Sequence, residues 1–98
     1  MTSIKYQSSN RDADYLPKGK MENLVDDIKK QMNKGDSIRS GGDVLCDFYY
    51  GANPFGFANV MTPGKGSPVV RLTAPNQHAL SELVHSFNVP YDKARIKE

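Results

Sequence analysis

Aromatic side chains are concentrated in one short part of the chain. Five of them lie between positions 48 and 57: Phe48, Tyr49, Tyr50, Phe55 and Phe57. This stretch has the pattern of two short strands joined by a turn rich in glycine and proline. A single pair of strands cannot bury so much ring surface on one face. We therefore expect that either the rings are divided between a core and an exposed face, or some of them await a partner.

Length and composition indicate one small globular domain. The chain has 98 residues, of which 38% are hydrophobic and 24% charged, and its net charge is +2. This mild positive charge neither requires nor excludes a polyanionic partner. One cysteine, Cys46, cannot form an internal disulfide bond, which favours a reducing, cytoplasmic location. No apolar run has the length of a signal peptide or a membrane helix, so we expect no association with a membrane.

Residues 20–34 have the pattern of an amphipathic helix. Acidic residues lie toward its start and lysines toward its end, as the helix dipole favours, and Gly35 is suited to ending it. The apolar stripe consists of Met21, Leu24, Val25, Ile28 and Met32.

Three strands are expected after a loop at residues 36–42. Residues 43–50, 56–62 and 69–73 alternate in character, and breaker-rich turns at 51–54 and 63–68 separate them. Because these turns are short, the strands are expected to form an antiparallel meander.

A second helix is expected at residues 74–87, with Thr73 as its N-cap and Pro90 beyond its end. Its apolar stripe consists of Ala79, Leu80, Leu83, Val84 and Phe87. Residues 1–19 are expected to be a flexible or partly anchored lead, with a short edge strand near 3–7, and residues 91–98 a charged tail. The globular domain would then span residues 20–90.

The fold class that follows is α+β, with the order αβββα in two layers. Both helical stripes need an apolar surface, and only the three-stranded sheet is large enough to provide it. Both helices are therefore expected on one face of the sheet, and the opposite face is expected to be open.

No residue pattern predicts catalysis. His78, Glu82 and His85 share one side of the second helix, but two helical turns are long for two ligands of one metal ion. Cys46 alternates with apolar neighbours as a small core residue does. We therefore expect a protein that is not an enzyme and has no metal or cofactor.

Two further patterns lack the geometry that their chemistry needs. Residues 64–67, Gly-Lys-Gly-Ser, resemble a phosphate-binding loop in composition, but a strand rather than a helix follows them. Asp26 and Asp27 are adjacent on a helix and diverge by about 100°, so they cannot act as an acid and base pair.

The order helix, three strands, helix resembles the double-stranded RNA-binding domain in outline. That family binds phosphates through lysines at the start of its second helix. The corresponding residues 74–78 here are Ala-Pro-Asn-Gln-His and include no lysine. The resemblance therefore implies a similar order of elements without the family's main phosphate contact.

Binding is the remaining class of function, and the partner considered is either another protein or a nucleic acid. Asp47, Tyr49, Arg71 and Val69 are expected on the open sheet face. Phe55 is expected in the turn beside it, either exposed or folded back onto the core beside Tyr50. Tyrosine and phenylalanine at such places are common anchors of protein interfaces, while the same rings can stack on unpaired bases. The residues expected to bind nucleic acid are Lys65, Arg71, Lys93 and Arg95.

The leading hypothesis is a small intracellular regulator or inhibitor that docks on a larger protein. Its expected contacts are Tyr49, Phe55, Lys65 and Arg71, and a homodimer through an edge strand is a further option. Single-domain chains of this size that lack a catalytic set are frequent among phage-encoded and mobile-element-encoded modulators of host machinery. Weak nucleic-acid binding is the alternative.

Overall fold

The computed structural model describes residues 1–8, 14–32, 37–40, 43–50, 53–61 and 68–91, and within residues 32–55 it describes the backbone alone. Its elements, in chain order, are β1 (Thr2–Gln7), β2 (Asp14–Tyr15), α1 (Lys18–Met32), β3 (Ser37–Ser40), β4 (Asp43–Tyr50), β5 (Asn53–Met61), β6 (Val69–Ala74) and α2 (Gln77–Ser86).

The strands form one six-stranded sheet in the order β2-β1-β6-β5-β4-β3. β1 and β2 are parallel, and every other neighbouring pair is antiparallel. The α+β class is confirmed, and β4, β5 and β6 are consecutive antiparallel neighbours as expected. The predicted size of the sheet is wrong, because β1, β2 and β3 extend the meander on both sides.

β1 lies inside the sheet, between β2 and β6, and is not the edge strand that the sequence suggested. Its alternating residues Thr2, Ile4 and Tyr6 are buried, and Ile4 is the register partner of Leu72 in β6. Local alternation predicted this strand, but only pairing with β6, far along the chain, decides its place. The predicted division into lead, domain and tail stays a prediction, and residues 9–13 and 92–98 lie outside the described part.

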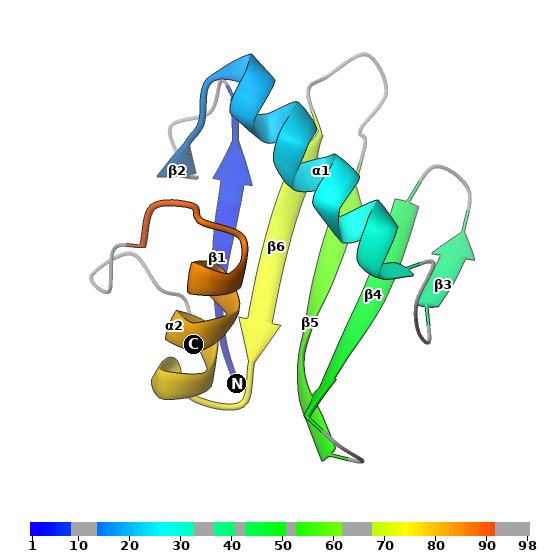
Figure 1. Ribbon diagram of the computed structural model, residues 1–98, viewed down its shortest axis with the longest axis vertical. Helices are drawn as coiled ribbons and strands as arrows, with labels where there is room; N and C mark the ends of the chain where they lie inside the picture. Colours follow the sequence, from blue (N-terminus) through cyan, green and yellow to red (C-terminus); the bar gives the residue numbers. More distant parts are fainter. Residues whose placement is uncertain (9–13, 33–36, 41–42, 51–52, 62–67, 92–98) are drawn as a thin grey trace.

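Both helices cover the same face of the sheet (Figure 1). α1 crosses the strands toward β4, and α2 lies near β1 and β6. The helix residues buried in this core are Met21, Leu24, Ile28, Leu80, Leu83 and Val84, and the sheet residues beneath them are Ile4, Tyr6, Ala58, Val60, Val70, Leu72 and Ala74. Both predicted apolar stripes are therefore confirmed wherever their side chains are described.

The predicted loop at residues 36–42 and the predicted turn at 51–54 are partly wrong, because β3 and the start of β5 lie within them. Ser37–Ser40 pairs with β4 inside the segment expected to be a loop, because sheet hydrogen bonds stabilise a short polar strand that has no apolar pattern of its own. Asn53 and Pro54 belong to β5 rather than to a turn.

The two helices also begin at other residues than expected. α1 starts at Lys18, so its first turn contains lysines and no acidic residue. α2 starts at Gln77, and its N-cap is Asn76, whose Oδ1 accepts a hydrogen bond of 2.8 Å from the Ala79 amide. Thr73 is part of β6 instead, which extends to Ala74.

Because of three strands outside the meander, the order of elements also differs from that of the double-stranded RNA-binding domain. β1 and β2 precede α1, and β3 lies between α1 and the meander. Among the described helices, none has the length and apolar character needed to cross a membrane.

Candidate binding face of the sheet

The sheet face opposite the helices carries the candidate site. Alternation along the strands sends one set of side chains toward the helices and the other set to this second face, which we call the open face. Most of its described side chains are half-buried, and no described helix lies over them (Figure 1). The open face is formed from β1, β5 and β6 by Ser3, Lys5, Phe57, Asn59, Met61, Val69, Arg71 and Thr73.

Arg71 occupies the centre of the open face. In β6 it is the register partner of Lys5 in β1 on one side and of Asn59 in β5 on the other. The next row contains Thr73, which is opposite both Ser3 and Phe57. Directly opposite residues have Cβ atoms about 4.5–5.5 Å apart, so the Lys5 and Arg71 side chains are immediate neighbours.

The electrostatics of this pair are unfavourable within the described part of the chain. Like charges directly opposite each other destabilise a sheet, and neither Lys5 nor Arg71 forms an ion pair with another described residue. The Arg71 Nε is buried and has no hydrogen-bond acceptor among the described residues, and the buried Thr73 hydroxyl also lacks a partner there. Unpaired buried polar groups each cost about 1–3 kcal/mol.

Apolar side chains flank these cations. Phe57, Met61 and Val69 are half-buried on the open face, and Met61 is the register partner of Val69. None of the three belongs to the core cluster between the helices and the sheet. The open face therefore combines a small basic centre with an apolar surround.

Tyr15 adds an exposed ring at the margin of the sheet. It lies in β2, pairs in parallel register with Gln7 of β1, and is 64% exposed. Its position follows from β2, a two-residue strand that has no sequence signature.

Of the predicted site residues, the structure places Arg71 on the open face. The side chains of Tyr49 and Phe55 are not described, and three further predicted residues lie outside the described part: Lys65, Lys93 and Arg95. Whether these residues meet at one surface stays a prediction. Sequence reasoning missed Lys5, Phe57 and Met61, since only the β1–β6 and β5–β6 registers bring them beside Arg71.

The backbone near Phe55 departs from regular pairing. β4 pairs Phe48 with Gly56 but pairs Tyr49 with Pro54, so Phe55 falls at a register shift. Such irregularities bend a strand and redirect side chains. Phe55 therefore lies within a strand, not in the turn that the sequence predicted.

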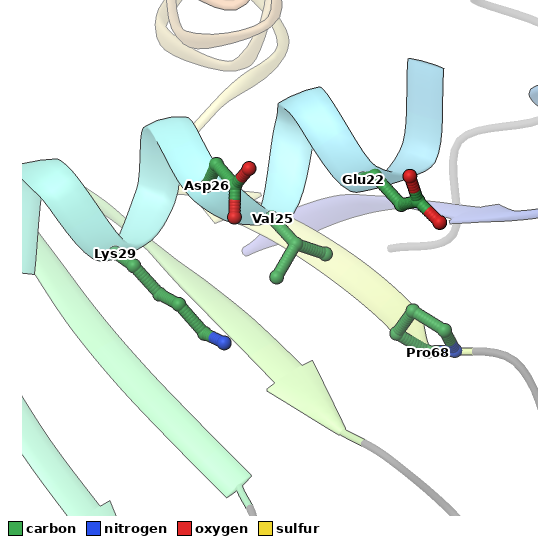
Figure 2. A pocket seen from close by; sticks show the side chains of 5 residues that line it. All are labelled: Glu22, Val25, Asp26, Lys29 and Pro68. Atoms are coloured by element: carbon green, nitrogen blue, oxygen red, sulfur yellow. The ribbon is translucent and has the colours of Figure 1, made fainter. Parts of the chain in front are cut away.

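A shallow groove lies beside α1 (Figure 2). It has a volume of about 330 Å³, and its lining residues are Glu22, Val25, Asp26, Lys29 and Pro68. The charged side chains that line it are exposed to solvent. No group of three His, Cys, Asp or Glu side chains suited to a metal ion occurs among the described residues.

The exposed side of α2 carries two solvent-exposed side chains, His78 and Glu82, that lie close together. His78 Nε2 lies 3.3 Å from Glu82 Oε1, and these side chains are 87% and 56% exposed. His78 and Glu82 therefore form an exposed pair on the surface of α2.

Comparisons with known proteins found no similarity for this chain: no family model matches it, and neither a curated protein nor a solved structure matches it significantly.

Proposed function

We propose that this chain is a small non-enzymatic binding protein that docks on a larger protein through the open face. The observation that supports it is the composition of that face, where half-buried Phe57, Met61 and Val69 surround Arg71, whose Nε has no acceptor among the described residues. Interfaces typically combine an apolar centre with arginine and aromatic anchors. The proposal includes action as a regulator or inhibitor in the reducing cytosol, and an origin in a phage or mobile element.

Charge favours a protein over a nucleic acid as the partner. The described part of the open face offers two cations, Lys5 and Arg71. Neutralising two phosphates would give a salt dependence with a slope of only about −1.8 in log K against log salt, which is small for a nucleic-acid binder. Burying the apolar surround contributes about 25 cal/mol per Å² regardless of salt.

Site-specific photo-crosslinking tests this proposal. A benzoylphenylalanine is placed at Phe57 on the open face, and a second variant carries it at Glu82, which is exposed on α2. In a nuclease-treated lysate of the source cells, we expect the Phe57 probe to capture a defined protein and the Glu82 probe to capture none. The proposal fails if the Phe57 probe captures no protein, or if its products disappear on nuclease treatment.

A second copy of the chain is one partner that this experiment detects. The edges of the described sheet are β2 and β3. Pairing of two copies along such an edge stays a prediction, and it would give a crosslinked product of twice the chain's mass only if the open face also meets the second copy.

A further inference from the structure

We infer that the protein surface recognised by the open face is acidic, with a carboxylate of the partner placed over the Lys5 and Arg71 pair. This inference rests on the proposed function, because it specifies the chemistry of the partner that the open face binds.

The register of β1 and β6 is the first step of the argument. Lys5 and Arg71 are directly opposite, so two positive groups meet at neighbouring positions in the middle of the sheet. No described carboxylate pairs with either one. A single carboxylate that approaches from outside the sheet can contact both groups at once. It relieves their mutual repulsion in addition to forming its own hydrogen bonds.

Arginine is suited to this contact. Its planar guanidinium presents several N–H donors in a fork that matches the two oxygens of a carboxylate. Asn59, the register partner of Arg71 in β5, adds an amide on the other side of the row. Donors from three adjacent strands therefore surround the position of one bound carboxylate.

The apolar side chains around the two cations explain why the bound carboxylate should belong to a protein. Phe57, Met61 and Val69 are half-buried on the same face, so a ligand that covers the cations also covers these side chains. A protein surface can present apolar side chains beside a carboxylate and bury both together. A phosphate backbone presents charge along its whole length, and two cations neutralise little of it.

The test is an NMR titration of the isotopically labelled protein with three probes. The first is a short peptide that alternates Glu and Val, the second is the same peptide with Gln in place of Glu, and the third is a single-stranded oligonucleotide. We expect the Glu peptide to shift amide signals of β1, β5 and β6, and the Gln peptide to bind about tenfold more weakly.

Two double variants show whether the cations cause the difference. Lys5→Gln with Arg71→Gln should reduce affinity for the Glu peptide at least about tenfold and leave affinity for the Gln peptide nearly unchanged. Lys20→Gln with Lys30→Gln removes the same charge from the exposed side of α1 and should change neither affinity. Thermal unfolding of both variants confirms that they are folded.

Three results overturn the inference. Equal affinity for the Glu and Gln peptides, including no binding of either, shows that carboxylates are not recognised. Shifts confined to α1 and α2 place the contact elsewhere. Tighter binding of the oligonucleotide on the open face identifies a nucleic-acid site. If crosslinking at Phe57 captures a protein while the peptides give any of these results, the inference is wrong and the proposed function stands.

Discussion

The Tyr6 hydroxyl donates a hydrogen bond of 2.5 Å to the carbonyl oxygen of Pro90, a residue 84 positions away. Tyr6 is fully buried in β1, and Pro90 follows α2. Val89 and Tyr91, on either side of Pro90, pack against the core. This hydrogen bond therefore connects the segment after α2 to β1.

Replacing Tyr6 by phenylalanine should remove this hydrogen bond and keep the buried aromatic ring. We expect Tyr6→Phe to lower the free energy of unfolding by about 1 kcal/mol, the usual net value of such a hydrogen bond. Urea unfolding at neutral pH measures it. Tyr15→Phe is the matched control, because Tyr15 is mostly exposed, and it should change stability little. Equal effects of the two variants would contradict the assigned role of the hydrogen bond.

The same tyrosine should make stability depend on pH in the alkaline range. Burial raises the pKa of Tyr6 well above its usual value, and the negative charges of Asp14 and ionised Tyr91 raise this pKa further. The folded protein therefore holds this proton at a pH where the unfolded chain releases it. The stability contributed by the neutral hydroxyl is fully present below about pH 10 and is lost as pH rises toward the folded pKa.

Comparing wild type with Tyr6→Phe isolates this effect from other titrating groups. Unfolding should be measured at several values between roughly pH 8 and 11. Above about pH 10 the advantage of the wild type should shrink by up to about 1.4 kcal/mol per pH unit. An advantage that stays constant over this range would show that Tyr6 ionises equally well in the folded protein.

Gly56 is predicted to be intolerant of any side chain. A Cβ at this position would lie 2.6 Å from the Thr73 carbonyl oxygen and 3.1 Å from Leu83 Cδ2. The oxygen belongs to the backbone of β6, so it cannot move without disturbing the sheet. We expect Gly56→Ala to destabilise the fold by about 1–3 kcal/mol, measured by urea unfolding.

Gly19 provides the matched control for that substitution. A Cβ there meets nothing within 4 Å, and the residue lies in the first turn of α1. Because alanine has the higher helix propensity, Gly19→Ala should stabilise the protein by up to about 1 kcal/mol. If both alanines had the same effect, close packing of β6 and α2 on Gly56 would not be the cause.

The N-cap of α2 gives a prediction about the helix beside the first strand. Asn76→Ala removes the acceptor of the Ala79 amide and should cost about 1 kcal/mol. Asn23→Ala, at an exposed position inside α1, should be neutral or slightly stabilising. Asn76→Asp keeps an acceptor and should restore most of the stability, whereas no recovery would argue against capping.

Local sequence patterns predicted the elements that have strong periodicity. In the two helical stripes, which contain Leu24 and Leu83, an apolar residue recurs at every helical turn. This spacing can be read from the sequence without knowledge of any tertiary contact. Buried Ala58 and Val60 alternate with half-buried Phe57 and Asn59, in agreement with the alternation that predicted a strand at residues 56–62. These patterns also predicted a mixed α+β protein.

The elements that were missed have too little pattern of their own. β2 consists of two residues, and β3 has the polar sequence Ser-Ile-Arg-Ser. Their strand conformation depends on hydrogen bonds to β1 and β4, which lie close in the chain but which apolar periodicity does not reveal. The start of α2 was misplaced because Thr73 is a good N-cap in isolation but is required in β6, opposite Ser3.

The sequence by itself determined which described side chains of the two helices face the core, because the helical period is a local property of the backbone. It also identified Arg71 as a residue of the open face. Only the tertiary structure decided that β1 lies inside the sheet, and hence that Lys5 is the neighbour of Arg71. Strand order and register arise from contacts between residues far apart in the chain, so the basic centre of the open face exists only in the folded protein.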